Sequence, residues 1–282
     1  MLPGTLYCRD MMPRTLALAA RAAALTPPVL DRPLAAALGR LWCVADPGRR
    51  RAVATNRRAL AARFPLHAPF ASYVHALAGW LRLLAFDRAQ VLAATQVAGL
   101  EPLLAARDAS RGTVLVAAHV GEWEWGAAAL AARGLEVVAV AGTQMNPAWS
   151  PALARAKASL GVEVVGPDAG LLVRALGRGA VVALLVDGDV ATARRDARLG
   201  AGRAALPLGP AKLSARTGAR LVAGRCERTG GVYRVRLAAL DDGLAPGDDG
   251  ARFERTRAWL EAVLRETPGG WCVFRPFFEE VA

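Results

Sequence analysis

A histidine and two acids stand where apolar segments of this chain end. Residues Thr113–Ala118 are apolar and rich in β-branched side chains, which predicts a buried strand. His119 follows at once, and Gly121 lets the chain turn. Glu124 then opens the helical pattern of Glu124–Arg133. A histidine oriented by a carboxylate acts as a general base toward a hydroxyl group. The order of residues therefore predicts a base at the carboxyl end of a strand, where open α/β sheets bind ligands.

The separation of His119 and Glu124 restricts how they can meet. Side chains five residues apart on a regular helix point in different directions. Contact therefore requires that His119 lie on the turn before the helix and Glu124 in its first turn. The alternative is a core histidine next to a surface acid, which the helix dipole favours at a helix start in any case. Spacing alone leaves both interpretations open.

A second acid ends another buried strand. The apolar run Ala180–Val186 predicts a strand that stops at Asp187, on the same sheet edge as His119. Asp189 points the same way as Asp187 if the chain stays extended. The alternative is an aspartate that caps a turn, which is common. Whether Glu124 or Asp187 contacts His119 stays open at this point.

Strands that alternate with helices predict an α/β fold, with a central mixed, largely parallel sheet flanked by helices and a helical N-terminal region. We expect residues 1–95 to form this basic helical region and residues 96–282 the α/β core, the two making one structural unit. Further strands are expected at Leu135–Ala141, Val162–Val165, Leu221–Arg225, Val232–Ala238 and Trp271–Phe274. Further helices are expected at Arg50–Phe64, Tyr73–Phe86, Pro147–Leu160, Ala169–Arg178, Pro207–Thr217 and Phe253–Arg265.

Six segments in order resemble one enzyme family. The run HVGEWEWG from His119 is similar to the H-x-G-N-W-E form of the H-x-x-x-x-[DE] motif. That form is typical of the lipid A late acyltransferases (lauroyl and myristoyl transferases) and their lysophospholipid-acyltransferase-like relatives, which include phosphatidylinositol mannoside acyltransferases. The other five segments are Arg51–Pro65 (RAVATNRRALAARFP), Val97–Leu104 (VAGLEPLL), Val186–Asp189 (VDGD), Leu206–Val222 (LPLGPAKLSARTGARLV) and Trp271–Phe278 (WCVFRPFF).

The resemblance implies a glycerolipid acyltransferase-like fold and an acyl transfer reaction. The donor would be a thioester of acyl carrier protein or coenzyme A, and the acceptor a hydroxyl of a lipid such as a lipid A precursor or a lysophospholipid. His119 would be the general base, with Glu124 and Asp187 as catalytic acids, and no cofactor is expected. No serine or cysteine stands in a G-x-S-x-G pattern, which favours direct transfer over an acyl-enzyme. The alternatives are an inactive lipid- or carrier-binding protein of the same fold, and a thioester hydrolase.

The sequence departs from the family pattern at two places. Glu122 stands where the family usually carries Asn, and Gly170 falls where some relatives carry Arg. Arg174 lies close enough in sequence to replace that arginine. Backbone amides near Gly121 or in Leu208–Ala211 are candidate donors to an oxyanion. The residues that we expect to contact substrate are Glu122, Trp123, Asp189, Gly209, Pro210 and, on a polar loop, Arg194, Arg195 and Arg198.

The charge distribution points to an anionic membrane surface as a partner. The net charge is +12, and residues 1–100 hold 13 arginines and four aspartates. Basic residues near anionic headgroups each contribute roughly 1 kcal/mol. Nucleic acid is not expected, because no nucleic-acid-binding module is recognisable. The four cysteines are far apart and predict neither a zinc site nor a disulfide framework. We expect a monomer without a metal site.

The N-terminal region predicts attachment to a membrane without a span. The segment Leu16–Val44 is apolar but is interrupted by charges and prolines, whereas a span needs about 20 mostly apolar residues. Met12–Leu25 is typical of an amphipathic helix that lies in the interface, although an ordinary packed helix fits the same pattern. We therefore expect the protein at the cytoplasmic face of the bacterial inner membrane, peripheral or weakly anchored.

Overall fold

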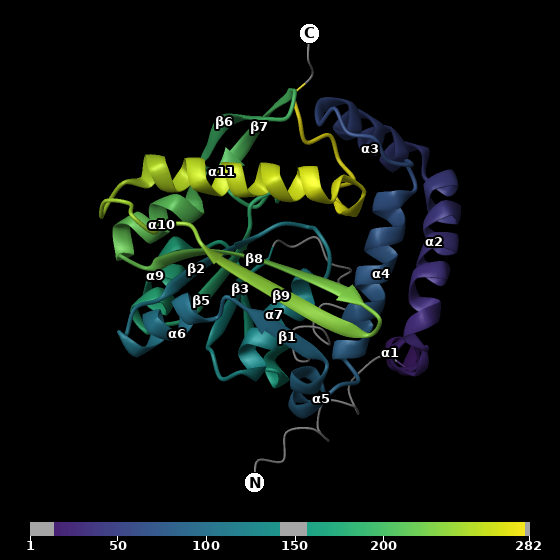
Figure 1. Ribbon diagram of the computed structural model, residues 1–282, viewed down its shortest axis with the longest axis horizontal. Helices are drawn as coiled ribbons and strands as arrows, with labels where there is room; N and C mark the ends of the chain where they lie inside the picture. The colour runs from purple at the N-terminus through teal and green to yellow at the C-terminus, as the bar shows by residue number, and fades with distance from the viewer. Residues whose placement is uncertain (1–13, 142–156, 280–282) are drawn as a thin grey trace.

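A seven-stranded sheet forms the centre of the protein in the computed structural model, which describes residues 14–141 and 157–279 (Figure 1). The strand order is β1-β9-β8-β2-β5-β3-β4, with β8 and β9 antiparallel and all other neighbours parallel. The predicted α/β fold with a largely parallel sheet is confirmed. The strands are β1 (Thr95–Ala98), β2 (Thr113–Ala117), β3 (Val137–Val140), β4 (Val162–Val165), β5 (Val181–Leu185), β8 (Arg220–Thr229) and β9 (Val232–Ala239).

Helices cover both faces of this sheet, and the side chains of β2 show how. Val114 and Val116 pack into one hydrophobic core with α9, α10 and α11, while Leu115 packs into another core with α6 and α7. Alternate residues of a strand point to opposite faces, and burial on both faces explains the unbroken apolar run. The helices are α5 (Arg88–Ala93), α6 (Glu101–Asp108), α7 (Trp123–Ala132), α9 (Ala169–Gly177), α10 (Gly209–Thr217) and α11 (Asp249–Glu266).

Four N-terminal helices lie along one side of the core (Figure 1). They are α1 (Arg14–Leu25), α2 (Pro28–Ala45), α3 (Pro47–Ala59) and α4 (Ala68–Leu83). Helix α2 packs along α4, and α4 in turn contacts α7. The two backbones come close at Gly39, where an added Cβ would lie 2.4 Å from the backbone nitrogen of Ala71. The division of the chain near residue 95 stays a prediction. Within the ranges that the structure describes, no helix is long and apolar enough to cross a bilayer.

Two sequence predictions about local structure are wrong. Arg194, Arg195 and Arg198 belong to a β-hairpin of β6 (Arg194–Leu199) and β7 (Gly202–Pro207), not to a polar loop. Strand β6 is polar and faces solvent, so it lacks the apolar pattern from which a strand is predicted. Gly200, with φ +60°, lies in the turn between β6 and β7. Trp271–Phe274 forms no strand, because only Trp271 makes an isolated bridge, to Val120.

Several other elements differ from the predicted boundaries or were not predicted. Helix α2 begins at Pro28, a position where the missing N–H is not needed, and it continues through Pro33. Strand β1 and helix α6 are too short to give a clear periodicity. A short 3-10 turn, Pro268–Gly270, precedes Trp271. The predicted helix Pro147–Leu160 lies mostly outside the described residues.

We predict that Gly39→Ala lowers the free energy of unfolding by about 1–3 kcal/mol, because the methyl group would overpack the contact between α2 and α4. Gly177→Ala is the matched control, since nothing lies within 4 Å of its added Cβ, and it should raise stability by up to about 1 kcal/mol through helix propensity. Chemical denaturation curves measure both. Equal stability of Gly39→Ala and wild type would contradict the described contact.

Candidate active site

Two adjacent parallel strands deliver His119 and Asp187 to the same edge of the sheet. Strands β2 and β5 pair in register, with Ala117 opposite Leu185. Each functional side chain follows its strand by two residues, so both lie just past the carboxyl end. This is the position at which open α/β sheets bind ligands.

The carboxylate of Asp187 holds the histidine through two hydrogen bonds. The distance from His119 Nδ1 to Asp187 Oδ1 is 2.9 Å, and the backbone N–H of His119 donates to Oδ2 at 2.8 Å. The indole N–H of Trp271 donates to the same Oδ2 at 2.8 Å. Asp187 is only 1% exposed. Because an ionised carboxylate only accepts, Nδ1 carries the proton and Nε2 is the free lone pair of the imidazole.

His119 and Asp187 each stabilise the charged form of the other. Burial opposes the charged form of His119, but the charge and hydrogen bond of Asp187 outweigh it and hold the histidine pKa above its usual value. Burial also works against the Asp187 carboxylate, yet His119 and the Trp271 indole keep its pKa below the usual range. The site is therefore built to stabilise an imidazolium next to a carboxylate.

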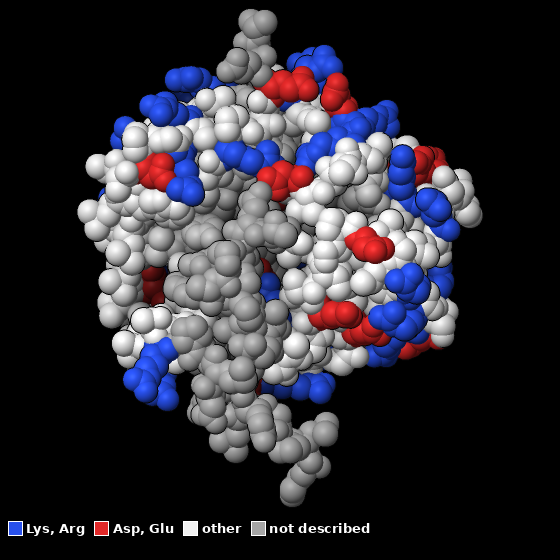
Figure 2. All heavy atoms as spheres, turned by 180° about the vertical axis from the view of Figure 1, so that it is seen from behind, with Lys and Arg blue, Asp and Glu red and all other residues white. Residues whose placement is uncertain are grey.

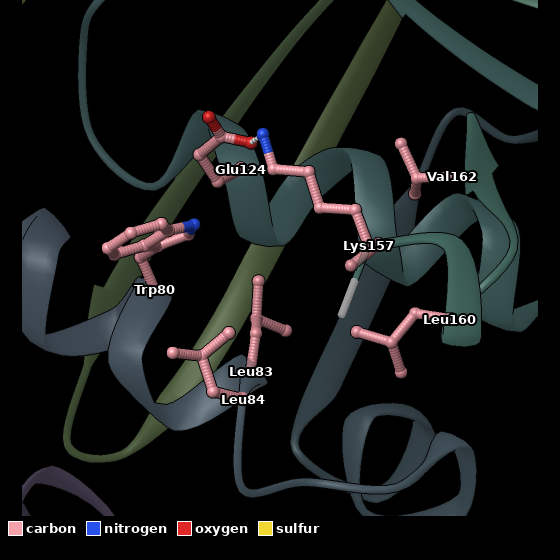
Figure 3. Close-up of a pocket in the computed structure, with 8 residues that line it drawn as sticks. Trp80, Leu83, Leu84, Glu124, Lys157, Leu160 and Val162 are labelled. Atoms are coloured by element: carbon pink, nitrogen blue, oxygen red, sulfur yellow. Dashed lines mark ion pairs between the residues drawn. The ribbon is translucent and has the colours of Figure 1, made fainter. Parts of the chain in front are cut away.

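Glu124, the other candidate partner of His119, pairs with Lys157 instead. The distance from Lys157 Nζ to Glu124 Oε2 is 2.7 Å (Figure 3). Figure 3 shows the pair above a small apolar pocket, whose other labelled residues are Trp80, Leu83, Leu84, Leu160 and Val162. Glu124 still acts on the histidine through space, because its negative charge also raises the pKa of His119. The structure thus assigns the direct contact to Asp187.

A large cavity opens over this edge of the sheet and brings most of the predicted site residues together. Its volume is about 1280 Å³. The predicted residues that line it are His119, Trp123, Glu124, Asp187, Asp189, Gly209 and Pro210. The Trp123 ring lies edge-on to the His119 ring, with 5.2 Å between centroids. Gly170 and Arg174 line the same cavity, so Arg174 places a guanidinium group close to Gly170 in it.

Four residues predicted to contact substrate do not line this cavity. Glu122 is buried and turned toward Arg228 and His75, and burial raises its pKa well above the usual range. Arg194 donates to the carbonyls of Gly188, Ala191 and Ala205 and so holds the chain after β5. The guanidinium of Arg195 lies over the Phe253 ring, and Arg198 is exposed on the hairpin. A role of these four residues in substrate binding stays a prediction.

Residues near the C-terminus complete the site, and sequence reasoning gave them no role. Besides the Trp271 indole, the Arg275 guanidinium contributes, since it donates to the backbone carbonyl of Asp187 at 3.0 Å. Asn56 of α3 holds this segment in place, since its side chain bonds the carbonyl of Arg275 and the N–H of Phe277. These residues belong to the quoted RAVATNRRALAARFP and WCVFRPFF segments, so the family resemblance was a signal that could have identified them.

The cavity carries an excess of basic side chains. Alongside Glu124, Asp187 and Asp189 it is lined by Arg49, Lys157, Arg174, Lys212, Arg216, Arg225 and Arg275. Anionic groups such as phosphates are therefore favoured in it. Across residues 14–141 and 157–279, no group of three or more His, Cys, Asp or Glu is arranged to hold a metal ion. Cys272, next to Trp271, is a poor nucleophile because burial raises the pKa of its thiol far above the usual value.

We predict that Asp187→Asn lowers the pKa of His119, because burial then acts without the opposing carboxylate charge. Glu124→Gln should lower this pKa less, since Glu124 makes no contact with the ring. The chain has only three histidines, so NMR titration of the imidazole signals, assigned with His119→Gln, measures both changes. A larger shift in Glu124→Gln than in Asp187→Asn would contradict the pairing described above.

Comparison with curated proteins finds no match for this chain. Comparison with protein-family models finds one that fits almost its whole length, the bacterial lipid A biosynthesis acyltransferase model, over residues 16–280. The matched residues include His119, the residues that line the basic cavity and the C-terminal segment that holds Asp187. The chain therefore belongs to the bacterial lipid A biosynthesis acyltransferase family.

Proposed function

We propose that this protein transfers a fatty acyl chain from a thioester to a hydroxyl group of a lipid acceptor, with His119 as the general base. The observation that carries the proposal is the His119–Asp187 pair at the edge of a basic cavity of about 1280 Å³. The acceptor class is a lipid A precursor or a lysophospholipid. The donor is acyl carrier protein or coenzyme A carrying the acyl chain. Family membership supports acyl transfer in general.

The proposed reaction needs two proton transfers, one from the acceptor hydroxyl and one to the leaving thiolate. Nε2 of His119 takes the proton of the acceptor hydroxyl while its oxygen attacks the thioester carbonyl carbon. Asp187 stabilises the imidazolium that results and holds the ring in the required tautomer. The carbon–sulfur bond then breaks, and the imidazolium returns its proton to the leaving thiolate. Direct transfer fits the absence of a nucleophile in a G-x-S-x-G pattern.

The start of helix α10 is our candidate for stabilising the oxyanion. Gly209 and Pro210 form its first turn and line the cavity. The first N–H groups of a helix have no intrahelical acceptor, and the dipole places positive charge there. The N–H of Gly209 and that of Ala211 would therefore favour negative charge on the carbonyl oxygen during attack.

The basic lining of the cavity supports a donor that carries phosphate. Coenzyme A and the prosthetic group of acyl carrier protein both present phosphates near the thioester arm, and carrier proteins are acidic. Lys212 and Arg216 of α10 and Arg174 of α9 line the cavity on the face opposite α7. Arginine and lysine bind phosphate oxygens through charge-assisted hydrogen bonds.

We place the protein at the cytoplasmic face of the inner membrane, and an apolar stripe on α2 supports docking on a lipid bilayer. Exposed leucines follow one another at helical spacing, at Leu30, Leu34, Leu38 and Leu41. On α1 and α2 the exposed charges are all arginine, while the one acid, Asp31, is buried. The edge of the molecule at which α2 lies is the left edge of Figure 2, where an uncharged stretch lies between basic side chains above and below it. Trp42 at the end of α2 also lines the cavity, which would bring its opening near the lipid.

We predict acceptor-dependent release of free carrier thiol from lauroyl to palmitoyl thioesters in the presence of membrane lipid extract. His119→Ala should slow this release roughly 10²- to 10⁴-fold, because the general base is lost. The rate of the wild type should rise with pH through a pKa above about 6.5, since Asp187 stabilises the protonated, inactive imidazolium. Release without acceptor would indicate a hydrolase. No release with any thioester from folded protein would indicate a binding protein.

We predict that the double substitution Leu38→Glu/Leu41→Glu weakens binding to anionic vesicles at least tenfold, because burial of one leucine contributes roughly 1.5–3 kcal/mol. Leu92→Glu, at an exposed leucine of α5 away from α2, is the control and should bind as the wild type does. Co-sedimentation with phosphatidylglycerol-containing vesicles, repeated with neutral vesicles, measures this. Unchanged binding of the double variant would refute docking through α2.

A further inference from the structure

A buried cluster of charged residues lies behind the histidine turn, on the side away from the cavity. Its members come from four separate elements: Asp31 of α2, His75 and Arg82 of α4, Glu122 before α7, and Arg228 of β8. Asp31, Arg82, Glu122 and Arg228 are all less than 9% exposed. Two arginines face two carboxylates, so the cluster is balanced in charge when both acids are ionised. The mechanism proposed above uses none of these residues.

Arg228 is the centre of this cluster. Its Nη1 donates to Asp31 Oδ2 at 2.7 Å, and its Nε donates to Glu122 Oε1 at 3.1 Å. Its Nη2 donates to the backbone carbonyl of His75 at 2.9 Å. We call the chain of Asp31, Arg228 and Glu122 the Arg228 bridge. Arg82 donates to the other oxygen of Asp31 at 2.6 Å, which fixes the end of the bridge on α2.

The Glu122 end of the bridge is fixed by more than one contact. Nδ1 of His75 lies 3.1 Å from Glu122 Oε1, and burial lowers the pKa of this histidine, which favours its neutral form. The other carboxylate oxygen lies against α4, where a Cβ added at Gly79 would be 2.0 Å from Oε2. The space between α4 and the histidine turn is thus fitted to a glutamate side chain.

Glu122 is also part of the turn that carries His119. Its backbone N–H donates to the carbonyl of Cys226 at 2.7 Å. Gly121 has φ +69°, and a Cβ there would lie 2.2 Å from the same carbonyl, so the turn lies directly against β8. Only Val120 and Gly121 separate Glu122 from His119. A displacement of Glu122 would therefore move the backbone of the histidine.

We propose that Glu122 is a positioning residue, which the Arg228 bridge holds so that the turn places His119 against Asp187 and the cavity. The expected effect on kcat rests on the proposed function, whereas the position of His119 can be tested in the protein without substrate. Buried ion pairs contribute little net stability, so a role in geometry accounts better for a cluster of this size. The glutamate side chain spans the distance to Arg228, and an asparagine here would be one methylene shorter.

The test compares Glu122→Ala with Glu122→Gln and a control. Glu122→Ala should lower kcat about 10- to 100-fold with little change in the donor KM, because a displaced base slows the chemical step rather than binding. The pKa of His119 should fall in the same variant, as its contact with Asp187 loosens. Glu122→Gln keeps an oxygen acceptor for Arg228 and should recover most of kcat and of the His119 pKa. Asp31→Asn, at the other end of the bridge, should act in the same direction as Glu122→Ala, because Asp31 accepts from Arg82 and Arg228 through different oxygens and an asparagine has only one.

Asp241→Ala is the control, because Asp241 is a buried partner of Arg220, 3.1 Å away, and lies beyond β9 at the end of the sheet remote from His119. It should lower the melting temperature while leaving kcat and the His119 titration unchanged. If Glu122→Ala and Asp31→Asn behave like this control, the inference is overturned. If the wild type transfers no acyl group, the proposed function fails, but the NMR titration of His119 still decides the positioning role. If Glu122→Ala does not fold, Asp31→Asn and Glu122→Gln decide.

Discussion

The Asp187 carboxylate is the group on which the rest of the site depends. It accepts hydrogen bonds from the ring and the backbone of His119 and from the Trp271 indole. Because it is almost fully buried, each of these donors offsets part of the cost of removing a charge from water. A lone carboxylate at this position would take up a proton. The three donors keep it ionised, and an ionised partner is what allows a buried imidazole to become positively charged.

Two of the donors to Asp187 come from segments far apart in sequence. His119 follows β2, whereas Trp271 belongs to the C-terminal segment that Asn56 of α3 holds in place. Arg275 of the same segment bonds the Asp187 backbone. The N-terminal helices, the sheet and the C-terminus therefore meet around one carboxylate. Asn56 thus links the helical region to the site, although that region does not contain the base.

The central sheet could be predicted from the sequence because its parallel strands are continuous apolar runs with turn residues after them. Thr113–Ala118 and Ala180–Val186 were within one residue of β2 and β5 at their carboxyl ends, which placed His119 and Asp187 on one edge. Which acid contacts the histidine could not be predicted, because Glu124 and Asp187 are equally compatible with the strand pattern. In the structure Glu124 forms an ion pair with Lys157, which is far from it in sequence, and Asp187 is left as the partner of His119.

The contacts of Arg194 and Glu122 could not be predicted from the sequence either. Both are charged and close in sequence to the base, which suggested substrate contact, yet one bonds three backbone carbonyls and the other is buried between α4 and β8. The internal partners of these two residues, backbone carbonyls for Arg194 and distant parts of the chain for Glu122, are not shown by the sequence pattern alone. Helix α2 was not predicted for a related reason. Its exposed face is as apolar as a core-facing one, and its prolines suggested an interruption of the helix.

The absence of a side chain at Gly79 has a consequence for how this sequence can change. An alanine there would collide with the Glu122 carboxylate, so it becomes acceptable only after residue 122 has become smaller. Asparagine is one methylene shorter than glutamate and would leave that space. Once the space is filled, a return to glutamate is blocked. The order in which these two substitutions can be made is therefore constrained.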